Sequence, residues 1–421
     1  MAGLDARVWW RIGWLSFGGP AGQIALMQRL LVDELRWIDA SRFLAALNFC
    51  MLLPGPEAQQ LATYIGWRRA GWRGALVAGG LFVLPGMLVM LALSVGYVMF
   101  GRLALVEAVF MGIKCAVVVI VIEALLRIAR RALVFRGAAW IALAAFLALH
   151  VLAAPFPLIV LVAAAIGWAL GRRRRDPVDA PAPERLRTSR ALVLATAALW
   201  LLPLAALGLW LGPDAILTRI AAMYSELALV TFGGAYAVLS YVAERAVTES
   251  AWLSARQMAD GLGLAETTPG PLILVLQFVA FVAAFQSGES GSPLWLGVFA
   301  SLVAVWSLFL PSFVWIFLGG PHLERLNANR ALRTALSCVT AAVVGVIAHL
   351  SLWFAAHVWF GEVGWARAGM LQVLSPTLSS LDPRALGLSA ISALLLFALH
   401  LGLARTLALS ALAGGVVYGL G

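Results

Sequence analysis

The chain has 421 residues, of which 62% are hydrophobic and only 12% are charged, and its mean hydropathy is +0.94. So little polar surface could not cover the core of a soluble protein, and the apolar stretches recur along the whole chain, as they do when lipid is the solvent. The formal net charge of +10 comes almost entirely from arginines in short loops, which is typical of basic cytoplasmic loops rather than of a nucleic-acid binder. We therefore predict an all-α, polytopic membrane protein.

Hydropathy divides the chain into thirteen predicted transmembrane segments. We predict that residues 1–171 form a first repeat of six segments, at about 8–31, 42–67, 74–98, 103–126, 137–154 and 157–171. An Arg- and Pro-rich cytoplasmic linker (172–190) and an additional helix (191–211) follow. Residues 212–421 form a second repeat of six segments, at about 223–243, 257–286, 294–318, 334–360, 384–402 and 404–421.

The second repeat is recognised by sliding the sequence along itself. At an offset of 215, Phe17-Gly18-Gly19 falls on Phe232-Gly233-Gly234, and Pro54-Gly55-Pro56 falls on Pro269-Gly270-Pro271. Further blocks match at offsets of 226 and 250, the last of which pairs His150 with His400. The second repeat therefore carries two insertions relative to the first, of 11 and 24 residues.

Loop charge predicts that the two repeats have opposite orientations. Arg68, Arg69 and Arg73 make one loop of the first repeat basic, whereas the matching stretch of the second repeat, QSGESGSP, has no basic residue. The basic loop of the second repeat lies instead at 325–333. Because basic loops stay in the cytoplasm, we predict inverted repeats, with the N-terminus in the cytoplasm and the C-terminus outside.

The two Pro-Gly-Pro sequences predict helices that break at membrane depth. Proline removes a backbone donor and glycine weakens a helix, and such breaks survive in a membrane only where protein or a wet cavity covers them. A helix that restarts after the break presents free N–H groups and a partial positive charge, which suit an anion. Two structural kinks are the alternative, but breaks at matched places in inverted repeats are typical of transporters.

The candidate residues fall into two groups. The predicted substrate-binding residues are Phe17, Gly18, Gly19, Pro54, Gly55, Pro56, Gln59, Gln60, Gly233, Gly234, Thr267, Thr268, Pro269 and Gly270. The predicted coupling or charge-balancing residues are Glu57, Lys114 and Glu266.

Each of the charged candidates has an alternative. Glu57 could titrate as substrate binds or could cap a helix N-terminus. Lys114 could balance a buried anion or pair with Glu107 or Glu123, although the spacing of Glu123 and Arg127 predicts a pair within one helix.

The motifs FGGPAGQIALM (17–27), CMLLPGPEAQQLATYIGW (50–67) and LFVLPG (81–86) resemble the signatures of the chromate ion transporter family, whose long-chain members also contain two homologous halves. The resemblance implies a membrane transporter that exports chromate, with sulfate as a near competitor, and that confers chromate resistance. It includes Pro20, Phe232 and Pro271 among the matched positions. The second half departs from the motif, since Leu272 stands at the position that matches Glu57.

The function predicted from the sequence is thus export of a chromate-like oxyanion across the inner membrane, driven by the membrane potential. Proton exchange is an additional hypothesis. Uptake of sulfate or another oxyanion, and a membrane-bound reductase, are the alternatives. No nucleotide fingerprint or metal-ligand pattern is visible in the sequence, so we expect neither a cofactor nor enzyme activity. The expected partners are the oxyanion and the lipid bilayer, and a homodimer is left open.

Overall fold

The computed structural model describes residues 5–17, 19–101, 103–172, 188–231, 235–323, 326, 329–369 and 371–419. The α-helices are α1 (Ala6–Leu15), α2 (Gly19–Gln28), α3 (Ala40–Leu52), α4 (Glu57–Phe100), α5 (Ala104–Ala132), α6 (Ala138–His150), α7 (Phe156–Arg172), α8 (Arg190–Leu211), α9 (Ile216–Val230), α10 (Ala235–Ala243), α11 (Ala255–Thr267), α12 (Val275–Gln286), α13 (Pro293–Gly319), α15 (Arg330–Trp359), α16 (Pro383–Ala393) and α17 (Leu403–Gly419). The π-helical turns are η1 (Arg29–Glu34), η2 (Glu244–Glu249) and η6 (Leu394–Ala398), and the 3-10 turns are η3 (Leu272–Leu274), η4 (Gly320–His322) and η5 (Leu378–Ser380).

These elements confirm a polytopic helical membrane protein. Each predicted segment coincides with a helix or with a pair of helices that a break separates. Within the described part of the chain, five helices are long and apolar enough to cross a membrane, namely α4, α5, α8, α13 together with η4, and α15. In α4 the backbone leaves the helical conformation at Ala70 and Gly71, between the predicted segments 42–67 and 74–98. Most of the predicted linker, 173–187, lies outside the described residues.

The helix boundaries repeat with the offset found in the sequence. Shifting α3 by 215 residues gives the bounds of α11, and the same shift carries the π-helical turn η1 onto η2. A shift of 226 carries α5 onto α15 to within one residue at the C-terminal end. Since π-helical turns are rare and concentrate at functional sites, their recurrence at matched places shows that the local backbone repeats together with the sequence.

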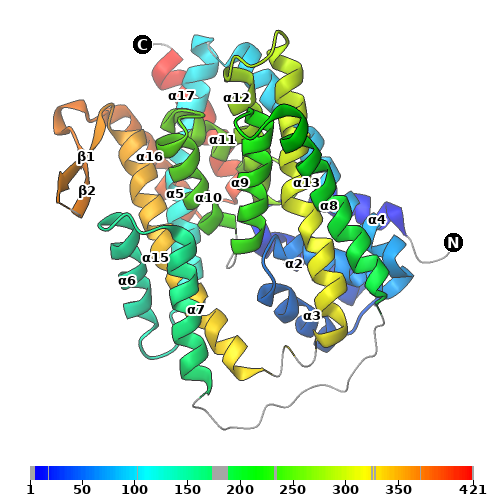
Figure 1. Ribbon diagram of the computed structural model, residues 1–421. Coiled ribbons are helices and arrows are strands. Elements are labelled where there is room, and N and C mark those ends of the chain that lie inside the picture. Colours follow the sequence, from blue (N-terminus) through cyan, green and yellow to red (C-terminus); the bar gives the residue numbers. More distant parts are fainter. Residues whose placement is uncertain are drawn as a thin grey trace. The chain divides into compact units, whose positions relative to one another are not determined.

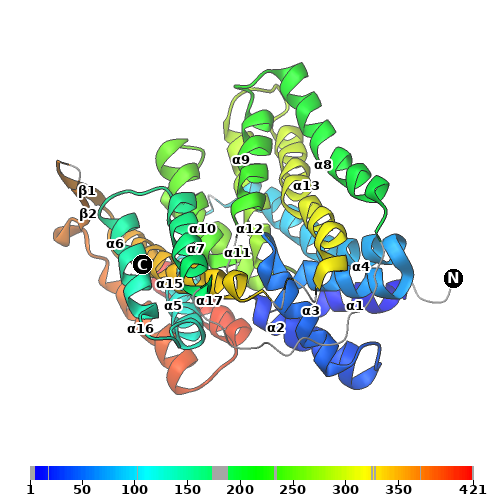
Figure 2. The ribbon, with the colours of Figure 1, turned by 60° about the horizontal axis from the view of Figure 1, so that its bottom comes forward.

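The described chain forms two compact units, each of which contains parts of both sequence repeats. Unit 1 comprises Met1–Ala92, Gly167–Val238 and Thr268–Leu336, and unit 2 comprises Leu93–Ile166, Leu239–Thr267 and Ser337–Gly421. In unit 1, α13 runs beside both α8 and α9 (Figures 1 and 2). The centre of unit 1 is α12, where every residue from Val275 to Ala284 is buried.

In unit 2, α5 packs along α17 through small residues. Ala108 and Gly112 on α5 face Ser410 and Gly414 on α17, and a Cβ added to Gly112 would overlap the carbonyl oxygen of Ser410. Small residues four apart on both helices are the usual means by which membrane helices approach closely. The contact leaves no room for a larger side chain at Gly112.

A β-hairpin follows α15 in unit 2 and was not predicted from the sequence (Figure 1). Strand β1 (Val363–Ala368) pairs antiparallel with β2 (Leu371–Pro376), so that Val363 lies opposite Pro376. It occupies part of the 24-residue insertion. The backbone N–H of Gln372 donates to the carbonyl of Val151 at the end of α6 (2.8 Å).

The tight α5–α17 contact makes a prediction about stability. Gly112→Ala should lower the apparent melting temperature of the purified protein in detergent, because overpacking costs about 1–3 kcal/mol. Gly415→Ala on α17 is the matched control, since its Cβ would meet only Val109 Cγ2, at 3.6 Å, and it gains the same helix propensity. Equal melting temperatures for the two variants would show that the helices do not meet at Gly112.

Candidate functional site

Both Pro-Gly-Pro sequences break their helices, as predicted. The first corner lies between the end of α3 at Leu52 and the start of α4 at Glu57, and the second lies between the end of α11 at Thr267 and the turn η3. Gly55 and Gly270 have φ angles of 120° and 90°, which side-chain-bearing residues rarely adopt. Glycine is therefore required at the middle of each corner.

Two crossed backbone hydrogen bonds tie each corner to the helix break of the other repeat within unit 1. The N–H of Gly55 donates to the carbonyl of Thr231 (2.9 Å), and the N–H of Gly270 donates to the carbonyl of Ser16 (2.7 Å). The two bonds are related by the 215-residue offset, since Ser16 and Thr231 each precede a Phe-Gly-Gly sequence. Donors that the broken helices would leave unpaired are thus satisfied across the two repeats.

The corners also pack against matched points on α4 and α13. A Cβ added to Gly86 on α4 would overlap the carbonyl oxygen of Pro269, and a Cβ added to Gly55 would lie 3.2 Å from Oγ of Ser312 on α13. Gly86 and Ser312 each follow a Leu-Pro pair and correspond at the offset of 226. The second repeat thus supports the first corner, and the first repeat supports the second.

The two corners line one pocket in unit 1. The first repeat contributes Pro20, Gln23 and Gly55–Ala58, and the second contributes Thr231 and Pro271–Ile273. The first turns of the restarting helices, at Glu57 and Leu272, therefore face the same space, where their N–H groups have no partner within the helix. The cavity volume is about 20 Å³, close to what one water molecule requires, so a tetrahedral anion needs a wider pocket.

Buried amide groups contact both corners. Nε2 of Gln23 donates to the carbonyl oxygen of Gly270 (2.6 Å), and Nε2 of Gln60 donates to that of Pro54 (2.7 Å). Gln59 is fully buried, yet neither atom of its amide has a hydrogen-bond partner among the described residues, and the same holds for Oγ of Ser312. Leaving such a group unpaired costs about 1–3 kcal/mol, so these unpaired donors and acceptors destabilise this conformation.

The remaining predicted substrate residues are distributed as follows. Gly19, at φ 67°, starts α2, and Phe17 is 47% exposed and does not line the pocket. Thr268 is buried, and the hydroxyl of Thr267 donates to the carbonyl of Leu264 (2.8 Å). Gly18, Phe232, Gly233 and Gly234 lie outside the described residues.

The sequence comparisons follow the same two-part pattern. The model of the chromate transporter family matches residues 6–168 and again 218–420. The chain belongs to the chromate transporter family. A chromate transport protein of Pseudomonas aeruginosa is 36% identical over 80% of this chain and 77% of its own length, and one of Cupriavidus metallidurans is 29% identical over 80% and 78%. An uncharacterized transporter of Methanocaldococcus jannaschii is 24% identical over 82% of each chain. No solved structure matches the chain.

Membership of the chromate transporter family makes the chain a transporter rather than an enzyme. The two residue blocks that the family model matches each contain one Phe-Gly-Gly break and one Pro-Gly-Pro corner. The structural repeat and the family pattern therefore coincide.

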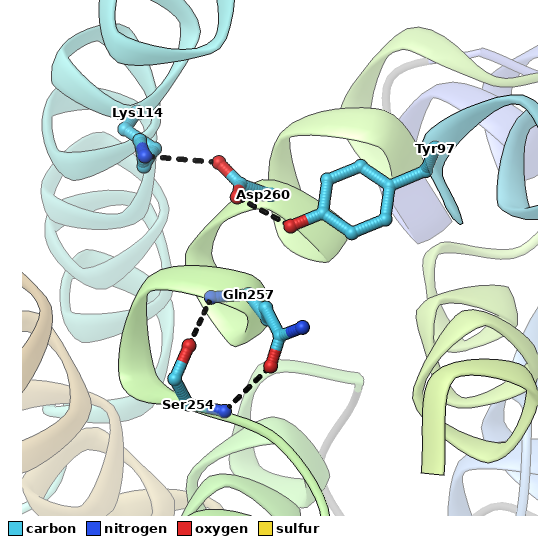
Figure 3. Close-up of polar contacts among 5 residues, drawn as sticks. All are labelled: Tyr97, Lys114, Ser254, Gln257 and Asp260. Carbon is cyan, nitrogen blue, oxygen red and sulfur yellow. Dashed lines mark hydrogen bonds and ion pairs between the residues drawn. The ribbon is translucent and has the colours of Figure 1, made fainter. Parts of the chain in front are cut away.

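A second polar cluster lies in unit 2 and contains the predicted coupling residue Lys114 (Figure 3). Its Nζ pairs with Oδ1 of Asp260 on α11 (3.1 Å), and the hydroxyl of Tyr97 donates to Oδ2 of the same carboxylate (2.8 Å). The proposed partners Glu107 and Glu123 were wrong, because the acid that faces Lys114 comes from another helix.

The structure places the other charged residues as follows. Glu123 and Arg127 form the predicted pair within α5. Glu57 lines the pocket and is half-buried. Its carboxylate is stabilised by the positive end of the helix dipole, but it repels an anion in the pocket. Glu266 is buried in α11 of unit 2.

Sequence analysis missed three residues that the geometry brings to these sites: Gln23, Thr231 and Asp260. Gln23 lies in the FGGPAGQ motif, one helical turn after the break, and its position there was the available signal. Thr231 acts through its backbone carbonyl, which no residue pattern reveals. Asp260 was detectable as an acid inside a predicted transmembrane segment, where ionisable residues are costly.

The unpartnered amide of Gln59 makes a prediction that contrasts two fully buried glutamines. Gln59→Leu should leave the apparent melting temperature unchanged or raise it, because it removes an unsatisfied group. Gln277→Leu should lower it, because Nε2 of Gln277 donates to the carbonyl of Met87 (3.0 Å). Thermal unfolding of both variants in detergent tests this, and a larger loss for Gln59→Leu would mean that its amide is satisfied in the folded protein.

Proposed function

We propose that the protein exports chromate across the cytoplasmic membrane, and that the anion binds in the unit 1 pocket between the two Pro-Gly-Pro corners. The observation that carries this proposal is the convergence of two restarting helices on one pocket. Both present N–H groups and positive dipole ends to the same space. The relatives from Pseudomonas aeruginosa and Cupriavidus metallidurans are chromate transport proteins by name. We propose chromate as the substrate of this chain on the basis of those names.

Two polar groups beside the first corner do not line the pocket in this conformation, but we propose that they contact the oxyanion once the corners separate. Nε2 of Gln59 and the hydroxyl of Ser312 are buried donors that lack a partner among the described residues. A tetrahedral dianion accepts hydrogen bonds on all its oxygens, so its entry would satisfy donors that are otherwise costly. Sulfate has the same shape and charge, and we expect it to compete. Because the pocket is too small for either ion, the corners must separate during transport.

The membrane potential suits export of a dianion. Moving two negative charges out of a cell that is negative inside yields about 4.6 kcal/mol per 100 mV. At about 150 mV this is near 7 kcal/mol, which corresponds to a gradient of roughly 10⁵-fold. Export would give chromate resistance, whereas uptake would require several co-transported cations per anion.

The proposal includes the membrane topology. We place the two repeats, 1–171 and 212–421, in opposite orientations, with the helix at 191–211 between them, the N-terminus in the cytoplasm and the C-terminus outside. The loop charges and the crossed hydrogen bonds at a constant offset support this arrangement. Because each of these hydrogen bonds joins one repeat to the other, neither repeat can form them alone.

A vesicle experiment tests the function. Inside-out vesicles that contain the wild-type chain should accumulate labelled chromate when energised, and collapse of the potential at a constant pH gradient should reduce the rate at least tenfold. Gln59→Leu should also reduce the rate at least tenfold, because it removes a donor from the corner, and excess sulfate should compete. Chromate accumulation that persists without a potential would contradict electrogenic export, and accumulation only in right-side-out vesicles would indicate uptake.

A further inference from the structure

The buried cluster of Lys114, Asp260 and Tyr97 in unit 2 has the composition of an anion site that already holds an anion. The ammonium group of Lys114 forms an ion pair with one oxygen of the Asp260 carboxylate (3.1 Å), and the hydroxyl of Tyr97 donates a hydrogen bond to the other oxygen (2.8 Å). Figure 3 shows both donors directed at Asp260 from two sides. The side chains of Lys114 and Asp260 are only 7% and 6% exposed, so the ion pair is shielded from bulk solvent.

Lys114 is unusual in the sequence as well as in its position. It is the only lysine among the 421 residues, since every other residue of the 30 Lys and Arg is an arginine. Among the residues that the structure describes, it is also the only Lys or Arg side chain that is buried. Lysine carries a compact charge on a flexible stem, which can follow a ligand, whereas the arginine fork is rigid.

The two helices that carry the ion pair are held in close register. A reciprocal capping box starts α11, in which the N–H of Ser254 donates to Oε1 of Gln257 (2.8 Å) and the N–H of Gln257 donates to Oγ of Ser254 (3.2 Å; Figure 3). One turn beyond Asp260, a Cβ added to Gly263 would overlap Cγ2 of Ile113, the neighbour of Lys114. The carboxylate is thus placed beside the ammonium by backbone packing.

We propose that Lys114 and Tyr97 form a second oxyanion-binding station, which the Asp260 carboxylate occupies as an internal substitute until it is protonated. One proton binds to a carboxylate oxygen of Asp260, forming one O–H bond, and that bond breaks again when the oxyanion leaves. With Asp260 ionised, the pair is neutral and both donors are engaged. With Asp260 protonated, Lys114 keeps its positive charge and both donors are available to a tetrahedral dianion.

Proton binding and oxyanion binding are therefore linked with a positive sign, and each strengthens the other by the same factor. This inference rests on the proposed function, because it assumes that the chain carries a tetrahedral oxyanion. It also places the proton on α11, whose last residue, Thr267, is separated from the second Pro-Gly-Pro corner only by Thr268.

Other charged groups lie on the helices that carry the cluster. On α11 they are Arg256, one turn earlier and exposed, and the buried Glu266. On α5 they are the exposed Glu107 and the Glu123–Arg127 pair.

Helix α17 also packs on α11, and it carries the exposed Arg405 and the partly buried Tyr418. The hydroxyl of Tyr418 donates to Asp382 rather than to Asp260. All these groups are left unchanged in the variants below except for Glu123, which serves as the control.

Sulfate binding to the full-length protein in detergent tests the proposal, since sulfate is a tetrahedral dianion that does not oxidise the protein. We expect the wild type to take up one proton for each sulfate bound, and therefore to bind sulfate about a hundredfold more tightly at pH 6 than at pH 8. Asp260→Asn should bind with the higher affinity at both pH values and take up none. Lys114→Met should bind at least tenfold more weakly, and Glu123→Gln should match the wild type.

Two outcomes overturn the proposal. One is an Asp260→Asn variant with wild-type affinity and pH dependence, and the other is an Asp260→Asn variant that loses binding as Lys114→Met does, which would make the pair purely structural. If Asp260→Asn does not fold, Tyr97→Phe decides, because it keeps both charges: severalfold weaker sulfate binding supports the station, and unchanged binding overturns it. If the proposed function itself is wrong, wild-type vesicles will not accumulate chromate. That result is distinct from the sulfate-binding results of the variants.

Discussion

Two backbone hydrogen bonds, from Gly55 to Thr231 and from Gly270 to Ser16, are the interactions on which the rest of unit 1 depends. A membrane interior has no water to satisfy the donors that a broken helix exposes, so each corner must find a carbonyl elsewhere. Each finds it in the break of the other repeat. The breaks are therefore mutually stabilising, and neither repeat can keep its Pro-Gly-Pro corner without the other.

The same constraint produces the pocket. Once the corners meet, the first turns of two helices face one space, and their N–H groups favour negative charge there. The second repeat has Leu272 where the first has Glu57, so the two walls of the pocket are unequal in charge although their backbones correspond. Unit 2 contains a buried ion pair instead of converging helix ends, because Asp260 neutralises Lys114 directly. Under the two proposals above, helix dipoles in one unit and a buried charge in the other would each hold an anion in a medium of low dielectric constant.

The broken helices could be predicted from the sequence because proline and glycine act locally, and their recurrence was visible as a repeat. The partners of Gly55 and Gly270 could not, since Ser16 and Thr231 contribute backbone carbonyls that any residue possesses. Lys114 was identified as costly in a membrane, but its acid was sought on its own helix, where spacing can be counted. Asp260 comes from α11, and contact between two helices depends on packing at positions such as Gly263 and Ile113. The β-hairpin was missed because hydropathy was the main signal.

The most direct test of the central claim is a structure of the chromate-soaked protein with chromium located by its anomalous scattering. We expect chromium in the unit 1 pocket, with chromate oxygens within hydrogen-bond distance of the N–H groups that start α4 and η3, and with the two corners further apart than in the structure described above. Chromium bound elsewhere in the protein, with the pocket between the corners empty at saturating chromate, would contradict it.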